Sequence, residues 1–447
     1  MLEPQSTVLF ILLALGFGAL MWWMLIARRV LLRVLAAGLA FVLAVVFGVM
    51  VVNKYYGYYQ TWGAAVADLT SQGISVPQVA PSAFTPGALF DGFDRSLINL
   101  ELARQQGFTA GLTITGKRSD ISREVYIYLP PQYFQPRYRN YRFPVIELIH
   151  GQPGTPQDWI DVVGVTITLD RLMKARRARP AVLVMPDANG GIRVSLQCLN
   201  QVGGPQDLTY LGVDLPDEIA HILRVQRPGP GWGVAGYSEG GFCAANMALR
   251  LRHSFGFAGV LSGYFRPFNN ELANPMRRAS PFGRDRALRR ENTPQYEAVA
   301  LPAGTVIPRF WLGAGTGDRQ DVSDAEYFWQ ELSLRQTGVP LVLTPGGGHT
   351  MATWRREVPA MLEWMTSGLA KVAGPAPAPA PARVVIPVCS WAGLVWGRQG
   401  PDNGWLVYRP GTCPGRGADA AAAFRLPGGS RWVRLAGRSR PIAPAVA

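Results

Sequence analysis

The stretch that decides the fold is GWGVAGYSEGGFCAANMALR, residues 231–250. It opens with a short apolar run typical of a buried strand and closes with a run that suits a helix. Between them, GYSEG at 236–240 matches the pattern Gly-x-Ser-x-Gly, which holds a serine on a sharp turn between a strand and a helix. Small neighbours permit that turn, and the helix N-terminus directs backbone N–H groups at negative charge. We therefore interpret Ser238 as a candidate nucleophile.

Around this stretch, apolar and β-branched runs alternate with longer segments that suit helices. The apolar runs lie at 124–130, 143–151, 180–187, 231–237, 257–264, 308–315 and 339–346, and the clearest helical segments at 215–225, 239–253 and 325–336. This alternation predicts an α/β fold over residues 107–370, with a mostly parallel sheet covered by helices on both faces.

Two residues follow Ser238 in the order nucleophile, acid, histidine, which such a sheet places in loops at the carboxyl ends of its strands. His349 lies in a glycine-rich loop after the last predicted strand, where an exposed general base is expected. Asp318 is the first carboxylate after the preceding strand, and we predict that it orients the imidazole. Asp321 and Asp324 are close alternatives, and each also suits the cap of the helix predicted to follow.

An oxyanion hole needs two backbone N–H donors near the nucleophile. The residue after the serine normally gives one, which here is Glu239. The loop IHGQPGTPQDW at 149–159 follows the second predicted strand and offers Gln152 as the other. The alternative interpretation of this loop is a tight turn rich in glycine and proline.

The four cysteines, Cys198, Cys243, Cys389 and Cys413, lack Cys-x-x-Cys spacing, so no zinc site is predicted. In an exported domain Cys198 and Cys243 are expected to form a disulfide that steadies the active-site loop, although Cys243 also fits as a plain buried residue. Cys389 and Cys413 form a second possible pair in the tail. The sequence predicts neither a metal nor a cofactor.

Two apolar segments at the start predict a membrane hairpin. Residues 7–27 carry no charge and, at 1.5 Å per residue, span about 31 Å as a helix. Residues 30–52 follow, interrupted only by Arg33. Arg28, Arg29 and Arg33 gather at the short connection, which places that connection in the cytoplasm and everything after residue 53 outside. A cleaved signal peptide is the alternative, but the first segment has neither a positive start nor a small-residue cleavage site.

The rest of the chain divides by composition. Residues 54–106 form a juxtamembrane segment, 371–383 a Pro/Ala linker, and 384–447 a tail that is either poorly ordered or a small stapled module. About half of the net charge of +14 lies between Arg383 and Ala447, which hold nine arginines against two aspartates. Since the central region holds no compact basic run with interleaved aromatic residues, no nucleic-acid partner is predicted. The oligomeric state is left open.

Several motifs in order resemble the putative-esterase family of α/β-hydrolases, which includes esterase D, feruloyl esterases and the secreted mycolyltransferases. The motifs are YIYLPPQYF, VIELIHGQPGTPQDWI, LVMPDANGG, TYLGVDLPDEI, GYSEGGFCAANMALR, GTGD and PGGGHTMATW, within residues 110–368. An N-terminal hairpin before such a domain looks like the membrane-anchored members of high-GC actinobacteria. The resemblance implies an α/β-hydrolase fold, a triad of Ser238, Asp318 and His349, and oxyanion amides from Gln152 and Glu239. The mycolyltransferases differ, with a secretion signal and a catalytic glutamate.

The sequence thus predicts a membrane-anchored, extracytoplasmic serine esterase that cleaves acyl esters through an acyl-enzyme. The alternative is an acyltransferase that moves the acyl group onto a sugar or lipid hydroxyl in the cell envelope. A third hypothesis is a non-catalytic envelope-binding protein on a hydrolase scaffold. Acyl chain length and the alcohol are not readable, because pocket residues come from variable loops.

Overall fold

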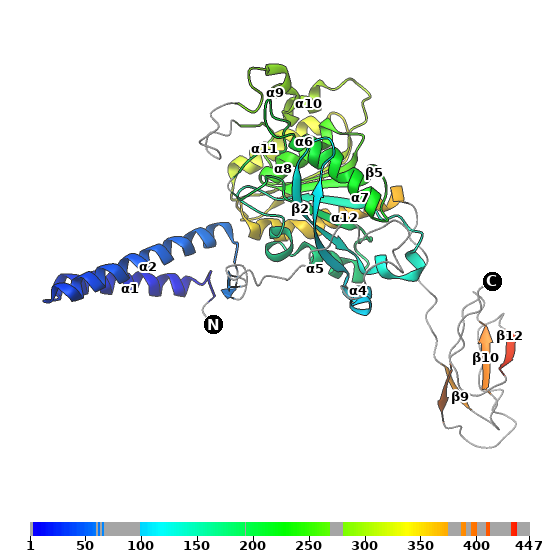
Figure 1. Ribbon diagram of the computed structural model, residues 1–447, viewed down its shortest axis with the longest axis horizontal. Coiled ribbons are helices and arrows are strands. Elements are labelled where there is room, and N and C mark those ends of the chain that lie inside the picture. Colours follow the sequence, from blue (N-terminus) through cyan, green and yellow to red (C-terminus); the bar gives the residue numbers. More distant parts are fainter. Residues whose placement is uncertain are drawn as a thin grey trace. The chain divides into compact units, whose positions relative to one another are not determined.

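The computed structural model describes residues 3–59, 61–62, 65–66, 99–192, 194–268 and 280–373, and in the tail 386–389, 395–399, 408–411 and 431–435. The chain divides into two compact units, Met1–Ala376 and Pro377–Ala447. Figure 1 labels the elements.

An eight-stranded sheet in the order β1-β2-β4-β3-β5-β6-β7-β8 forms the centre of the first unit. Its strands are β1 (Phe108–Thr115), β2 (Ser122–Leu129), β3 (Val145–Ile149), β4 (Val182–Pro186), β5 (Gly229–Tyr237), β6 (Phe255–Leu261), β7 (Arg309–Gly315) and β8 (Leu341–Thr344). Strands β1 and β2 pair antiparallel, and so do β2 and β4, while the remaining neighbours are parallel. The predicted mostly parallel sheet is confirmed.

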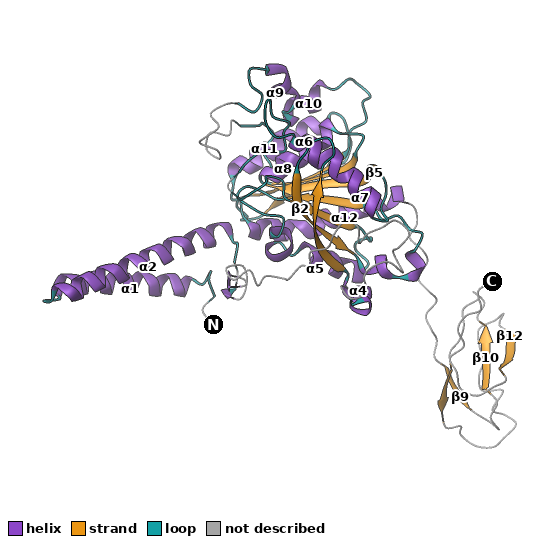
Figure 2. Ribbon diagram, viewed as in Figure 1, coloured by secondary structure: helices purple, strands orange, loops and turns teal. Residues whose placement is uncertain are grey.

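Helices cover both faces of this sheet, which makes three layers (Figure 2). Strand side chains alternate between the layers: in β5, Trp232 and Val234 belong to one buried cluster, whereas Ala235 and Tyr237 belong to the other. The first cluster contains residues of α7, α8 and α11, and the second contains residues of α5 and α12. The described α-helices from residue 99 onward are α4 (Leu100–Gln106), α5 (Val165–Lys174), α6 (Asp207–Thr209), α7 (Leu215–Ile222), α8 (Glu239–Arg250), α9 (Arg286–Glu291), α10 (Pro294–Ala300), α11 (Arg319–Ser333) and α12 (Met351–Ala373).

All seven apolar runs predicted as strands are strands, from β2 to β8. The eighth strand, β1, lies at the edge of the sheet next to β2 and has a mixed sequence, FTAGLTIT, that no buried apolar run marked. Helix α11 begins at Arg319, six residues earlier than the helix predicted from Ala325. Because α11 begins at Arg319, Asp318 is its N-cap and Asp321 lies in its first turn.

Two apolar helices precede the sheet, α1 (Thr7–Ile26) and α2 (Val30–Tyr56). They run antiparallel, with the Phe10 and Phe47 rings edge to face at 5.7 Å and Lys54 Nζ 3.1 Å from Thr7 Oγ1 (Figure 1). Both are long and apolar enough to cross a membrane by length and composition, and no residue of α1 is buried.

The tail contains four short strands in the part that the structure describes. Strands β10 (Val395–Gln399) and β12 (Arg431–Leu435) pair antiparallel, and β9 (Ile386–Cys389) pairs with β11 (Tyr408–Gly411) in parallel. Cys413 lies outside the described residues, and so does the suggested pairing of Cys389 with Cys413.

Candidate active site

Ser238 occupies the turn between β5 and α8 in a backbone conformation that is rare for any residue other than glycine. Its φ is 57° and its ψ is −121°. The Ser238 N–H donates to the Leu261 carbonyl at 2.9 Å, and the N–H of Gly241 donates back to the Ser238 carbonyl at 2.9 Å. A non-glycine residue in this region costs roughly 1–3 kcal/mol and persists only where its surroundings enforce it. The turn therefore holds Ser238 at the carboxyl end of the sheet, as the pattern predicted.

Two glycines let neighbouring backbone approach this turn. A Cβ at Gly240 would lie 2.1 Å from the Ile149 carbonyl oxygen, so α8 begins directly against the end of β3. A Cβ at Gly151 would lie 3.1 Å from the Ser238 Cβ, so the loop after β3 lies beside the serine. Larger residues at these positions would displace the turn.

His349 lies in the loop between β8 and α12, and its Nε2 is 2.8 Å from Ser238 Oγ. This loop is fixed to the loop after β7: Gly317 N–H donates to the Gly347 carbonyl at 2.6 Å, and Gly346 N–H donates to Thr316 Oγ1 at 2.9 Å. The Trp354 ring packs edge to face on the imidazole at 5.2 Å. The imidazole is partly exposed, with 29% of its side-chain surface accessible.

Asp321 is the carboxylate that contacts His349, which corrects the prediction of Asp318. Asp321 Oδ2 and Oδ1 lie 2.8 and 3.1 Å from His349 Nδ1, and Asp321 is 8% exposed. Asp318 is instead the N-cap of α11, and its side chain accepts from the N–H groups of Gln320 and Asp321 at 2.9 and 3.0 Å. The roles are exchanged because α11 starts at Arg319, which makes Asp318 the capping residue and places Asp321 in the first turn, directed at the histidine.

The loop after β3 is held by a buried histidine. His150 Nδ1 lies 2.7 Å from the Gly151 carbonyl oxygen, and His150 Nε2 accepts from the Ala188 N–H at 3.0 Å. Nδ1 therefore carries the proton, because Nε2 is already an acceptor. The Gly151 carbonyl shares a planar peptide unit with the N–H of Gln152, so this bond fixes the direction of that N–H. The assignment of Gln152 and Glu239 as oxyanion donors stays a prediction.

The Glu239 carboxylate forms a buried polar network that the sequence did not reveal. It accepts from Asn189 Nδ2 at 2.9 Å and from the Ser195 hydroxyl, and the residue is 4% exposed. Burial raises the pKa of Glu239, although the two hydrogen bonds act in the opposite direction. The network joins the start of α8 to the loop after β4. The sequence contains no local signal for this network, because Glu239 and Asn189 lie 50 positions apart.

A second group in that loop is strongly acidic. Burial alone would raise the pKa of Asp187, but the neighbouring His150 ring and hydrogen bonds from the N–H groups of Asn189 and Gly190 lower it to about 2. Asp187 Oδ1 accepts these N–H groups at 3.0 and 2.8 Å. A permanently ionised Asp187 therefore shapes the loop through backbone contacts.

A disulfide joins Cys198 and Cys243, as predicted, with the two Cα atoms 5.5 Å apart. Both cysteines are buried, at 0% and 1% exposure. The bond closes a segment with a sequence separation of 45 residues and connects the loop after β4 to the first turns of α8. The covalent link and the Glu239 network thus tie together the same two elements.

Asp318, Asp321 and His349 place potential metal-ligand atoms within 4.8 Å of one another. These groups already have other partners: Asp318 accepts from two backbone N–H groups, and the two His349 nitrogens face Asp321 and Ser238. The arrangement suits a hydrogen-bonded relay better than a metal centre. The predicted absence of metal and cofactor is not tested by this geometry.

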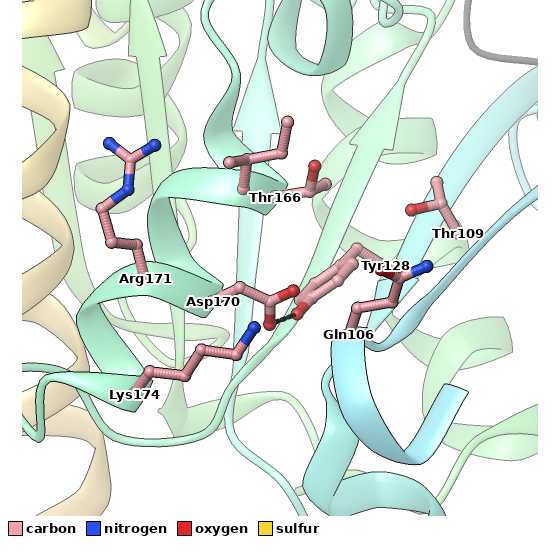
Figure 3. A pocket seen from close by; sticks show the side chains of 8 residues that line it. Gln106, Thr109, Tyr128, Thr166, Asp170, Arg171 and Lys174 are labelled. Atoms are coloured by element: carbon pink, nitrogen blue, oxygen red, sulfur yellow. Dashed lines mark hydrogen bonds between the residues drawn. The ribbon is translucent and has the colours of Figure 1, made fainter. Parts of the chain in front are cut away.

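A separate cavity of about 560 Å³ is lined by other residues, and Figure 3 shows the side chains that line it. Its lining includes Tyr128, Asp170 and Lys174, and the Tyr128 hydroxyl donates to Asp170 Oδ1. Tyr128 pairs with Leu183 near the start of β4, so this side of the cavity lies toward the amino ends of the parallel strands, whereas Ser238 follows the carboxyl end of β5. Among the described residues that line it there is no serine, cysteine or histidine.

Comparison with known proteins places this domain in a family. The family model "Putative esterase" matches residues 117–365. An uncharacterized protein of Corynebacterium glutamicum is 25% identical over 340 residues, which cover 74% of this chain and 76% of that protein.

Among solved structures, a ferulic acid esterase has a TM-score of 0.51 and 19% identity, covering 59% of this chain and 99% of that one. The fluorophosphonate-binding serine hydrolase F of Staphylococcus aureus has a TM-score of 0.48 and 19% identity, covering 58% and 98%. At 19% identity, the likeness to the ferulic acid esterase shows the fold alone. The family match covers more than half of the chain, and it agrees with the sheet order and with the serine turn. The chain therefore belongs to the putative-esterase family, on an α/β-hydrolase fold.

Proposed function

We propose that this protein is a membrane-anchored, extracytoplasmic serine esterase. The observation that carries the proposal is the continuous hydrogen-bonded series from Ser238 Oγ to His349 Nε2, at 2.8 Å, and from His349 Nδ1 to Asp321 Oδ2, at 2.8 Å. These atoms stand in the order nucleophile, general base and orienting acid.

The chemistry follows from these positions. His349 takes the Ser238 hydroxyl proton through Nε2 while Oγ attacks the ester carbonyl carbon, and Asp321 holds the tautomer with the proton on Nδ1 and stabilises the imidazolium. The N–H groups of Gln152 and Glu239 stabilise the oxyanion that forms. Collapse of this intermediate releases the alcohol, which receives the proton from His349. Water, activated by the same base, then cleaves the acyl-enzyme.

Two features support an anchored domain outside the cytoplasm. The helices α1 and α2 are each long enough to span the hydrocarbon core of a bilayer, and Arg28, Arg29 and Arg33 lie at their connection, which favours the cytoplasmic side. The buried disulfide between Cys198 and Cys243 is the kind of bond that persists in oxidising compartments.

The test is hydrolysis of p-nitrophenyl esters of increasing acyl length by the full-length protein in detergent. We expect p-nitrophenol release with one preferred chain length, and loss of release in Ser238→Ala. Adding glycerol or trehalose measures acyl transfer in the same assay, because transfer that outpaces hydrolysis identifies the acyltransferase alternative. A folded protein that releases no p-nitrophenol from any ester and transfers no acyl group would contradict the proposal and favour a non-catalytic role.

A further inference from the structure

The chain leaving α2 is folded back onto the hairpin. Asn53, which is 8% exposed, accepts the Tyr59 N–H on Oδ1 at 2.7 Å and donates from Nδ2 to the Tyr59 carbonyl at 2.9 Å. Gln5, just before α1, donates to the same carbonyl at 3.2 Å. Gly57 ends α2 with a φ of 71°, a conformation that favours glycine. Residues 57–59, called the exit turn below, are therefore fixed to the ends of both helices.

The same exit turn is docked on the catalytic domain. Arg355 donates from Nη2 to the Gly57 carbonyl at 2.9 Å and from Nη1 to the Val162 carbonyl at 2.7 Å. The Tyr58 hydroxyl donates to the Pro153 carbonyl at 3.2 Å. A Cβ at Gly57 would lie 3.4 Å from the Ala352 nitrogen, so the turn also packs against the start of α12.

Two of these partners flank the loops that carry the candidate site residues: Pro153 lies in the loop after β3, and Ala352 lies in the first turn of α12, directly after the His349 loop. Pro153 directly follows Gln152, the predicted oxyanion donor, and Ala352 lies three residues after His349. Gly151 is beside Ser238, and two Cα steps from Gly151 to Pro153 cover at most about 8 Å. The exit turn at the end of α2 thus contacts Pro153, next to the predicted oxyanion donor, and the first turn of α12, next to the His349 loop.

We propose that the exit turn holds the Ser238 site close to the membrane surface, so that the enzyme hydrolyses acyl esters that reside in the bilayer. The inference rests on the proposed esterase function and on α1 and α2 lying in the membrane. An ester dissolved in the same bilayer reaches the docked site at a high effective concentration, whereas a water-soluble ester gains nothing from the docking.

The experiment changes the docking without changing the site. A flexible insert of ten glycine and serine residues between Tyr56 and Gly57 leaves Gly57 and Tyr58 free to bind Arg355 and Pro153, but separates them from α2. The matched control carries the same insert between Ala376 and Pro377, beyond the catalytic domain. Each full-length protein is reconstituted in palmitoyl-oleoyl phosphatidylcholine vesicles. Its activity is measured on 4-methylumbelliferyl palmitate dissolved in those vesicles and on 4-methylumbelliferyl acetate in water.

We expect the insert after Tyr56 to lower vesicle-ester hydrolysis on the order of tenfold relative to the control insert, with acetate hydrolysis within about twofold. Equal vesicle activity of the two inserted proteins would overturn the inference while leaving the esterase intact. An unaltered protein that cleaves acetate but not the vesicle ester would overturn it too. Failure of the unaltered protein to cleave either ester would instead contradict the proposed esterase function. Equal loss on both esters would show that the exit turn serves only to stabilise the site, which also overturns the inference.

Discussion

The two ends of the central sheet each contain a hydroxyl that is hydrogen-bonded to an ionisable partner, yet among the described residues a histidine contacts that hydroxyl at one end alone. At the carboxyl ends, Ser238 stands on a strained turn and contacts His349, which Asp321 orients. At the amino ends, the Tyr128 hydroxyl donates to Asp170 beside the 560 Å³ cavity. A large pocket with a perturbed carboxyl group is a common starting hypothesis for an active site.

The two ends differ in the partner of the hydroxyl, which is a basic imidazole at Ser238, and in the backbone, which places a helix N-terminus behind Ser238. Burial raises the pKa of Asp170 to about 6, and burial beside Asp170 raises the pKa of Tyr128 well above its usual value. The tyrosine therefore keeps its proton at neutral pH and is a poor nucleophile. Ser238 has an imidazole within hydrogen-bond distance of its hydroxyl and a helix N-terminus behind it. Cavity volume and a shifted pKa are therefore weaker indicators of an active site than a hydrogen-bonded series of nucleophile, base and acid.

The largest expected effect is at the carboxyl ends. Ser238→Ala removes the nucleophile, and we expect ester hydrolysis to fall by at least about 10⁴-fold, with an almost unchanged melting temperature because alanine keeps the Cβ and the backbone of the turn. Tyr128→Phe at the amino ends is the matched loss of a hydroxyl, and its kcat/KM is expected to stay within about twofold. Comparable losses in the two variants would break the comparison.

The second-largest expected effect on kcat distinguishes Asp321 from Asp318, which lie one helical turn apart at the start of α11. Asp321→Asn keeps the shape but favours the wrong tautomer of His349, and we expect kcat to fall by about 10³–10⁴-fold. Asp318→Asn keeps an N-cap of similar quality, so its kcat should change by less than about tenfold and its stability very little. Steady-state kinetics on one p-nitrophenyl ester measure both variants. A larger loss in Asp318→Asn than in Asp321→Asn would return the acid role to Asp318.

The sequence predicted the fold and most of this site because its signals were local. Seven strands were marked by apolar runs, and Ser238 and His349 by glycine-rich turns at strand ends. Strand β1 was missed, since an edge strand of mixed polarity lacks a buried run. The acid was predicted to be Asp318 rather than Asp321 because these two residues are one helical turn apart. Which of them caps α11 and which contacts His349 depends on where α11 begins. The Glu239–Asn189–Ser195 network was missed because it joins residues 50 positions apart.

A moderate effect concerns the disulfide that braces the reactive end. Replacing Cys198 and Cys243 together by alanine frees a loop of about 45 residues in the unfolded chain, and we expect the free energy of unfolding to fall by about 3–4 kcal/mol. Denaturant unfolding followed by fluorescence measures the change. Addition of a reductant should lower the stability of the parent protein but not that of the variant. Equal unfolding midpoints for parent and variant would show that the bond does not brace the loop.

The smallest effect lies at the amino ends. The raised pKa of Asp170 means that the native state binds this proton more tightly than the unfolded chain, so its contribution to stability is full below about pH 4 and declines as the pH rises to about 6. Asp170→Asn lacks this decline, and its melting temperature relative to the parent should therefore increase by a few degrees between pH 4.5 and 7. Hydrolysis should be unaffected. A parallel pH dependence of the two proteins would contradict the raised pKa.

Covalent labelling tests the central claim most directly. The full-length protein is treated with a fluorophosphonate probe, digested, and analysed by mass spectrometry, with Ser238→Ala and Asp318→Asn treated in parallel. We predict one adduct, on the peptide that contains Ser238, present in the parent and in Asp318→Asn and absent from Ser238→Ala. An unlabelled Ser238 in folded protein that still hydrolyses esters, or an adduct that survives in Ser238→Ala, would contradict the assignment of the nucleophile.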